Sequence, residues 1–326
     1  MKSRQQDRTS LDDAVDKVLN DCLGMHEGEQ VLVIADPHPD RRRITEALVT
    51  RARRLRAEVV VAEMTERGSD GEEPPAAVAA AMLACDVVIA PTTKSLSHTE
   101  ARERATSEGA RIATMPMITE ATLVRAMRAD YTEIKRRSTA LADLLTEGSL
   151  VHVTSNLGTD LTFSIRGREA LPDDGDVTVP GSFANLPAGE AYIAPVEGSA
   201  EGRIVFDGSV VPFEELLAEP IVVEVRNGLA AGFSGGRGAE WKAIMEVHGT
   251  DAFNLAELGI GTNENATLCG CVLEDEKIMG TIHLAFGDNH TFGGAVSVDS
   301  HLDGVLMSPT LDVDGQALLV NGRLVI

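Results

Sequence analysis

The residue types best suited to chemistry lie in the C-terminal half, and the clearest of them is Ser300-His301-Leu302-Asp303. If this segment is a strand, His301 and Asp303 point to the same face about 7 Å apart, because strand side chains alternate between faces. An imidazole and a carboxylate placed side by side form a two-ligand edge for a divalent metal. The spacing therefore predicts a metal-binding pair.

Three more polar residues lie upstream in apolar, glycine-flanked surroundings. His283 interrupts an apolar run, and a buried imidazole needs a partner such as a metal that fixes its orientation. Glu257 lies in LAELGIG, and a lone buried carboxylate is costly unless it is paired or ligating. Glu190 stands at a turn in LPAGEAY. Taken singly, His283 also fits an ordinary core histidine, Glu257 a salt-bridge acid and Glu190 a turn residue.

The first half of the chain alternates short β-branched runs with helical patterns. Strands are expected at 30–35, 58–63, 86–90 and 111–114, and helices near 40–55, 75–84 and 99–108. Such alternation predicts an α/β N-terminal domain with a parallel, Rossmann-like sheet over 1–147. No G-x-G-x-x-G follows the first strand, so a dinucleotide site is not supported.

The second half has a different pattern of apolar and polar residues. After an expected connecting helix over 130–145, short strands separated by Gly and Asp predict a mainly antiparallel α+β domain over 148–326. Helical pieces are expected at 240–248 and 254–258. The segment 271–273 is expected to be a strand, on which Cys269 and Cys271 would pack on one face.

Together the segments LPAGEAYIAP, LAELGIGTN, EDEKIMGTIHLAFGDN and SHLD resemble the aminopeptidase T/aminopeptidase S family of metalloaminopeptidases, in the same order. The resemblance is close over 150–326 and looser before it. It implies hydrolysis of an N-terminal peptide bond or a small amide by metal-activated water, and a homodimer. It also implies two divalent metals, zinc or cobalt with manganese possible, held by Glu190, Glu257, His283, His301 and Asp303.

One residue departs from that family pattern. His290 stands where the family has a tyrosine, seven residues after the first histidine of the motif. His290 could ligate a metal, act as acid or base, or do neither. In the hydrolase interpretation Glu190 could anchor the substrate amine, so Glu190 and His290 are the candidate catalytic residues.

Two other interpretations stay open. The 2,5-dihydroxypyridine dioxygenases look like diverged relatives that also end in H-L-D, and non-haem Fe(II) needs only two histidines and a carboxylate. His283, His301 and Asp303 could supply these ligands. Those dioxygenases resemble a version with histidine at the Glu257 position and an apolar residue at the His283 position, so the residue types here favour the hydrolase. The third interpretation is a non-catalytic small-molecule binding protein.

Composition excludes several classes of protein. The formal net charge is -22, with 51 acidic against 29 basic residues, which argues against nucleic acid. An Arg-rich run over 41–56 is either an anion-binding patch or the solvated face of a helix with Ile44, Leu48 and Leu55 inward. The polar N-terminus has no apolar signal region and no stretch of 18 apolar residues occurs, so a cytoplasmic protein without a membrane span is expected.

Overall fold

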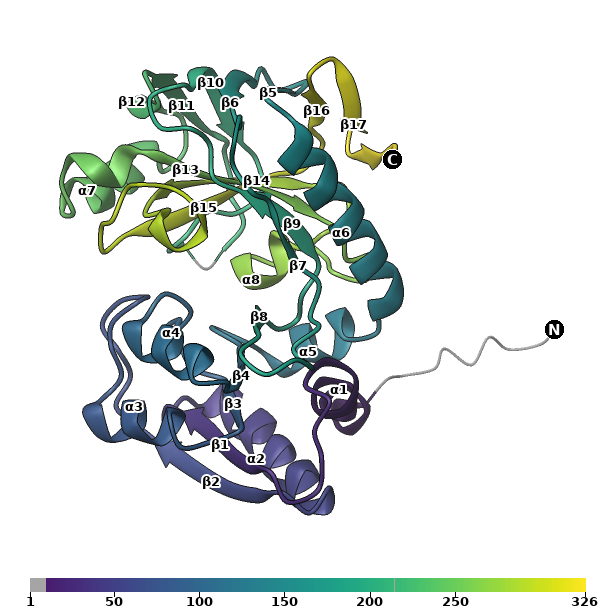
Figure 1. The fold of residues 1–326 in the computed structure, drawn as a ribbon. Coiled ribbons are helices and arrows are strands. Elements are labelled where there is room, and N and C mark those ends of the chain that lie inside the picture. The colour runs from purple at the N-terminus through teal and green to yellow at the C-terminus, as the bar shows by residue number, and fades with distance from the viewer. Residues whose placement is uncertain (1–9, 214) are drawn as a thin grey trace. The chain divides into compact units, whose positions relative to one another are not determined.

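The computed structural model describes residues 10–213 and 215–326, and the chain forms two compact units (Figure 1). Unit 1 consists of Met1–Ala129 and Gly175–Pro187, and unit 2 of Asp130–Asp174 and Ala188–Ile326. This division differs from 1–147 and 148–326 in two places. Helix α6 (Tyr131–Glu147) belongs to unit 2 because it packs on strands of that unit, and Gly175–Pro187 returns to unit 1.

Unit 1 is built on a five-stranded parallel sheet, sheet A, in the order β2-β1-β3-β4-β8. Its strands are β1 (Gln30–Ala35), β2 (Glu58–Glu63), β3 (Val87–Ala90), β4 (Arg111–Thr114) and β8 (Phe183–Asn185). The helical segments are α1 (Leu11–Lys17), η1 (Val18–Cys22), α2 (Pro39–Arg54), α3 (Ala76–Met82), α4 (Glu100–Ser107) and α5 (Glu120–Ala126). The expected parallel sheet is confirmed, and β8 is an additional edge strand from the second half of the sequence.

Helix α2 shows how the apolar pattern sets the packing in unit 1. Its buried residues Arg41, Ile44, Leu48 and Ala52 recur three or four positions apart and form one stripe. Ile44 and Leu48 face inward as expected, whereas Leu55 is only half-buried. Arg41 is the unexpected member, because it is a charged residue buried in the apolar stripe.

Unit 2 contains two antiparallel sheets. Sheet B has the order β12-β11-β10-β6-β5-β16-β17-β18, and sheet C has the order β15-β14-β13-β9-β7. The strands of sheet B are β5 (Leu150–Thr154), β6 (Asp160–Ser164), β10 (Glu201–Phe206), β11 (Ile221–Arg226), β12 (Leu229–Ser234), β16 (Thr310–Val313), β17 (Gln316–Val320) and β18 (Arg323–Leu324). Those of sheet C are β7 (Leu171–Asp173), β9 (Glu190–Ile193), β13 (Leu255–Gly261), β14 (Ile282–Gly287) and β15 (His301–Leu306). Besides α6, the helical segments are α7 (Gly238–Glu246), η2 (Thr250–Phe253), α8 (Val272–Asp275) and η3 (His290–Phe292).

Two local expectations in this unit are wrong. The segment 254–258 is not a helix but enters β13, a strand that is buried at every position and so has no period to reveal it. The segment 271–273 is not a strand, because Cys271 is the residue that caps the start of α8. Cys269 and Cys271 therefore share no strand face, and burial raises the pKa of the Cys271 thiol to about 12.

The core of unit 2 lies between the apolar faces of sheets B and C. Leu258, Leu284 and Phe286 of sheet C belong to the same buried cluster as Val223 and Phe206 of sheet B. The ring of Phe206 lies edge-on to that of Trp241, with centroids 5.2 Å apart, and the indole N–H of Trp241 donates to the Val211 carbonyl at 2.7 Å. Phe206 also lies edge-on to Phe286 of sheet C, with ring centroids 6.4 Å apart, so the aromatic packing joins the two sheets.

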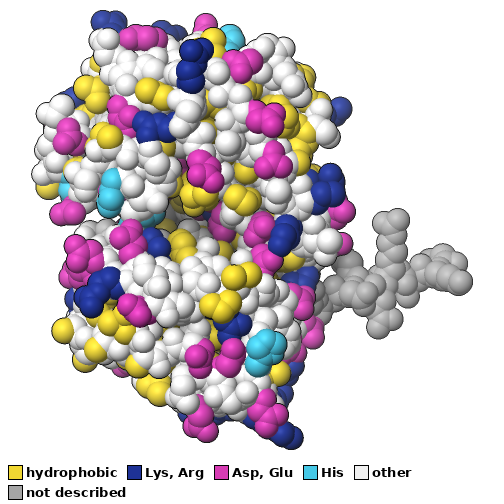
Figure 2. Space-filling view, in the orientation of Figure 1, with side chains coloured by type: hydrophobic (Ala, Val, Ile, Leu, Met, Phe, Trp, Pro, Cys, Tyr) yellow, Lys and Arg dark blue, Asp and Glu magenta, His cyan; other side chains and the backbone are white. Residues whose placement is uncertain are grey.

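Two features bear on the protein's surroundings. Within the described residues, no helix has the length and apolar character needed to cross a bilayer. On the face seen in Figure 2, acidic side chains are scattered widely among apolar and uncharged groups. The cytoplasmic location and the homodimer stay predictions.

Replacing Phe206 with alanine should destabilise unit 2 by about 3–5 kcal/mol, because it removes a buried ring that contacts Trp241 and Phe286. Denaturant unfolding followed by the fluorescence of Trp241, the one tryptophan of the chain, measures this change. Val247→Ala, at a position that is 81% exposed, is the control and should stay within about 0.5 kcal/mol of the parent. Equal stability of the two variants would contradict this account of the core.

Candidate metal centre

The site begins with the alternation of side chains on sheet C. On β14, Ile282, Leu284 and Phe286 enter the core, so His283 points to the opposite face. On β15, Leu302 and Leu306 enter the core in the same way. His301 and Asp303 therefore share the face of His283, as the H-x-D spacing predicted.

The neighbouring strands β13 and β9 follow the same rule. Leu258 and Ile260 of β13 face the core, which leaves Glu257 and Gly259 on the polar face. Glu190 starts β9 and pairs with Gly261 of β13. Across the sheet, Glu257 pairs with Ala285, and Ala285 pairs with Asp303. Four adjacent strands thus bring all five expected ligand residues onto one face.

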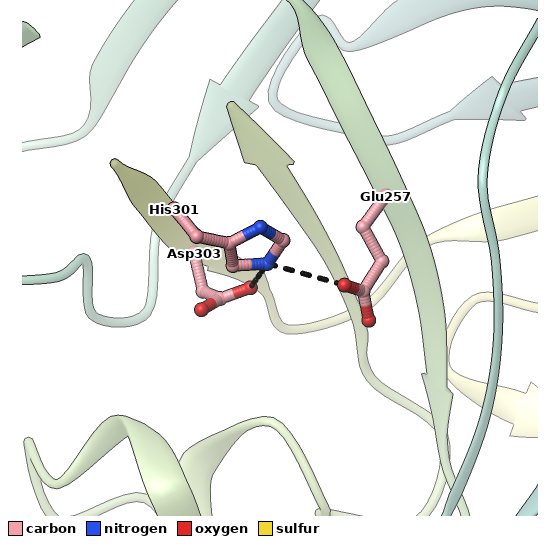
Figure 3. Close-up of side chains that lie close together, drawn as sticks. All are labelled: Glu257, His301 and Asp303. Carbon is pink, nitrogen blue, oxygen red and sulfur yellow. Dashed lines mark ion pairs between the residues drawn. The ribbon is translucent and has the colours of Figure 1, made fainter. Parts of the chain in front are cut away.

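Glu257 is the centre of this group. Its Oε1 is 3.2 Å from His283 Nε2, and its Oε2 is 3.1 Å from His301 Nε2. His301 Nε2 is also 3.4 Å from Asp303 Oδ1. Figure 3 shows Glu257, His301 and Asp303 converging. Glu190 Oε2 lies 3.5 Å from His283 Nε2. One carboxylate therefore stands between two imidazoles, with a further carboxylate beside each of them.

A glycine makes room for one of the imidazoles. Gly259 is paired with His283, and a Cβ at Gly259 would lie only 1.9 Å from Cε1 of that imidazole. The ring of His283 therefore lies directly against the backbone of β13. The first glycine of LAELGIG, Gly259, leaves space for this ring.

The loop after β14 fixes the orientation of His301. His301 Nδ1 is 2.8 Å from the Asp288 carbonyl, so Nδ1–H donates to that oxygen and Nε2 is the nitrogen directed at Glu257 and Asp303. The carboxylate of the same Asp288 accepts from His290 Nδ1 at 2.7 Å. His290 lies on η3 with its side chain 47% exposed, and no described contact joins it to the five residues on sheet C.

Three residues at the site were missed by the sequence reasoning. Lys277, which follows α8, is 1% exposed, and its Nζ lies 2.5 Å from Glu190 Oε1 and 2.9 Å from Glu276 Oε1. It also lies 3.4 Å from Asp173 Oδ2, at the end of β7. A buried ammonium requires such anionic partners. The run EDEK within an otherwise apolar segment was the available signal.

The buried charges shift one another's proton affinities. Burial raises the pKa of Glu190 to about 8, although Lys277 and His283 act to lower it. Burial alone would lower the pKa of His283, but Glu190 and Glu257 outweigh it and raise that pKa to about 10. Burial likewise opposes protonation of His301, yet Asp303 and Glu257 hold its pKa well above the usual range.

Glu257 shows the reverse balance. Burial would raise its pKa, but the hydrogen bonds from His283 and His301 hold it well below the usual range. Glu257 therefore stays ionised, and protons on the two imidazoles supply the positive charge beside it. A divalent cation could take the place of those protons, because a metal ligand must be a neutral imidazole.

The donor atoms fit a divalent metal. One atom each from Glu257, His301 and Asp303 lies within 4.8 Å of the others, and the same holds for Glu276, His283 and Asp303. Glu190 Oε2 and His283 Nδ1 are buried without a hydrogen-bond partner. Imidazole and carboxylate donors of this kind suit non-haem iron as well as other divalent ions. The geometry alone therefore does not choose the reaction.

Comparison with known proteins narrows the choice of reaction. A family model described as NicX, 2,5-dihydroxypyridine 5,6-dioxygenase, matches residues 10–326. The 2,5-dihydroxypyridine 5,6-dioxygenase of Pseudomonas putida is 26% identical, in an alignment that covers 92% of this chain and 91% of that protein.

Two solved structures share the fold. The 2,5-dihydroxypyridine dioxygenase of Pseudomonas putida superimposes with a TM-score of 0.84 at 24% identity, over 97% of this chain and 96% of that one. The aminopeptidase AmpT of Thermus thermophilus gives a TM-score of 0.72 at 17% identity, over 97% of this chain and 99% of that one. At these identities the likeness concerns the fold alone.

The expected metalloaminopeptidase is therefore wrong. The family model and the relative from Pseudomonas putida both name a dioxygenase, and the aminopeptidase is only a distant structural neighbour. Zinc and cobalt, which followed from the hydrolase interpretation, gain no support. Glu257 and His283 misled the interpretation because either enzyme class can use carboxylate and imidazole ligands.

Gly259→Ala should weaken metal binding by about 10–100-fold, because the new Cβ would displace the imidazole of His283. Anaerobic titration of Fe(II) against a competing chelator measures the affinity. Gly232→Ala is the matched control on β12, where an added Cβ would meet nothing closer than 3.7 Å. Unchanged affinity in the Gly259 variant would show that His283 is not a ligand.

Proposed function

The chain belongs to the 2,5-dihydroxypyridine 5,6-dioxygenase family, and from this premise we propose that it cleaves the ring of a dihydroxypyridine-like substrate with dioxygen and Fe(II). The observation that carries the proposal is the pair of imidazoles on the two oxygens of Glu257, with Asp303 beside them. Two histidines and a carboxylate on one face leave coordination positions open, as non-haem iron oxygenases require.

In this proposal His283, His301 and Asp303 hold the iron, and Glu257 lies between the imidazoles as a further ligand or as their acceptor. Bound Fe(II) would supply the redox chemistry that allows dioxygen to react with an aromatic ring. The protein's task is to place the ligands and to balance their charge. Asp288 fixes His301 through its carbonyl, and the Lys277 ammonium donates to Glu190.

Nearby rings support an aromatic substrate. The ring of Phe292 is edge-on to His301, with centroids 6.0 Å apart, and to Tyr192, with centroids 5.6 Å apart. Burial raises the pKa of Tyr192 above its usual range, so its hydroxyl stays protonated and can donate. In a chain with only 3% aromatic residues, Phe292 against a proposed ligand and Tyr192 against Phe292 provide an apolar surface suited to a flat substrate.

His290 is the proposed proton acceptor for the substrate hydroxyl. Its Nδ1 donates to the Asp288 carboxylate, which leaves Nε2 as the nitrogen that takes up a proton. The side chain is half-exposed and so accessible to a small molecule. Glu190 is less suited to this role, because one oxygen contacts Lys277 and the other faces His283. We assign Glu190 the positioning of His283.

The Fe(II)-loaded protein should consume dioxygen with 2,5-dihydroxypyridine, and dioxygen uptake should match substrate loss mole for mole. His301→Ala should lower both turnover and bound iron by at least about 100-fold, because it removes a ligand nitrogen. An oxygen electrode and elemental analysis provide the two measurements. His152→Ala, on sheet B with its imidazole paired to Asp160, is the control. No oxygen uptake by the loaded protein would refute the dioxygenase proposal.

His290→Gln should lower kcat by about 10²–10⁴-fold while bound iron stays unchanged, as expected for loss of a proton acceptor. Asp288→Asn should give a smaller loss, because the backbone carbonyl that holds His301 remains. Steady-state kinetics at saturating substrate, with iron measured on the same samples, separate the two effects. Full turnover in the His290 variant would remove this residue from the reaction.

A further inference from the structure

Buried side-chain atoms without a hydrogen-bond partner gather in two places among the described residues. In unit 2 they lie at or beside the metal centre, on Asp173, Glu190, His283 and Ser300. In unit 1 they are Asp36 Oδ1, Arg41 Nε and Nη1, and Thr93 Oγ1. Unpartnered buried polar atoms are rare in folded proteins, and an absent ion, water or ligand is a common reason for them.

The three residues of unit 1 lie at the carboxyl edge of sheet A, and we call them the edge cluster. Asp36 directly follows β1, and Thr93 lies in the loop after β3. The backbone N–H of Thr93 donates to Asp36 Oδ2, so the two loops are in contact. Arg41 lies in the first turn of α2 and belongs to the buried stripe of that helix.

The topology of sheet A makes this edge a place where ligands bind. From β1 the chain passes through α2 to β2 on one side, and the next strand, β3, lies on the other side of β1. In open parallel sheets the crevice outside the strand ends at such a reversal is the usual ligand site. The edge cluster occupies the loops on both sides of that reversal.

The remainder of the same edge needs no ligand. Thr114 ends β4 and Asn185 ends β8. Ser97 Oγ lies 2.9 Å from Thr114 Oγ1 and donates to Asn185 Oδ1 at 2.9 Å. These polar groups satisfy one another, whereas those of the edge cluster do not. The unsatisfied atoms therefore coincide with the reversal point and do not extend along the whole edge.

The polar groups of the edge cluster determine which kind of ligand could satisfy them. Arg41 is 5% exposed, and its guanidinium stays charged, so it calls for an anionic oxygen. Asp36 Oδ1 can only accept, and Thr93 Oγ1 can donate or accept. A bare inorganic anion would leave the Asp36 oxygen unsatisfied. The ligand that would satisfy all three residues is an anion with an O–H or N–H group close by.

We propose that the edge cluster binds a small organic acid with a hydroxyl or amino group next to its carboxylate. The carboxylate contacts Arg41, and the neighbouring donor is held by Asp36 and Thr93. This site is in unit 1 and uses none of the proposed iron ligands, so it stands whether or not the dioxygenase proposal holds.

Titration calorimetry of the full chain with sodium glycolate, at constant ionic strength, tests the proposal. Glycolate should bind saturably, and sodium acetate at least about tenfold more weakly, because it has no donor for Asp36. Sodium phosphate should also bind more weakly than glycolate. Equal binding of acetate, or tighter binding of phosphate, would overturn the assignment of an organic acid with a donor.

Variants locate the binding. Arg41→Gln should weaken glycolate binding by at least about tenfold. Arg43→Gln, in the same helix but with its side chain 72% exposed, should leave it unchanged. Thr93→Val keeps the shape of the side chain and removes the hydroxyl, so it decides the matter if the Arg41 variant does not fold. No saturable binding, or binding independent of both Arg41 and Thr93, would refute the edge site.

Discussion

The structure of unit 2 depends on carboxylates concentrated on one face of a single sheet. Burial makes ionised groups of like charge costly, so the face is stable only with cations placed among them. Lys277 supplies one such charge within hydrogen-bond distance of Glu190 and Glu276. His283 and His301 supply further positive charge against Glu257 when they are protonated, and a divalent metal can supply it when they are not. The need for compensating charge is what suits this face to a divalent cation.

The other face of the same sheet makes this arrangement possible. Leu258, Leu284 and Phe286 bury apolar area against sheet B, and this burial stabilises the strands that carry the charged residues. Because alternate residues of a strand belong to opposite faces, each apolar residue also fixes the direction of its polar neighbours. Gly259 lacks a side chain where the imidazole of His283 needs the space. On sheet C the buried charged residues lie on this polar face, where burial of charge is expected only at a functional site.

Sequence reasoning succeeded where a pattern repeats within a few residues. The β-branched runs predicted β1 to β4, and the H-x-D spacing placed His301 and Asp303 on one strand face. It failed where the deciding contacts come from distant segments. Strand β13 is apolar around Glu257, and only its pairing with β9 and β14 distinguishes it from a helix. Strand β8 joins sheet A from the second half of the chain.

Buried charges set a further limit on what the sequence could predict. The Arg-rich run reads as a solvated helix face, and the inward position of Arg41 follows from its place in the stripe of α2, not from its residue type. Lys277 is buried because Asp173 and Glu190 arrive from β7 and β9, more than eighty residues earlier.

The ligand types predicted a metal but not the reaction, since imidazoles and carboxylates serve hydrolases and oxygenases alike. The contacts around the ligands were also not predictable from the sequence. There Asp288 holds both His301 and His290, and Phe292 lies against His301. Those contacts depend on the path of the loop after β14, which no short sequence period encodes.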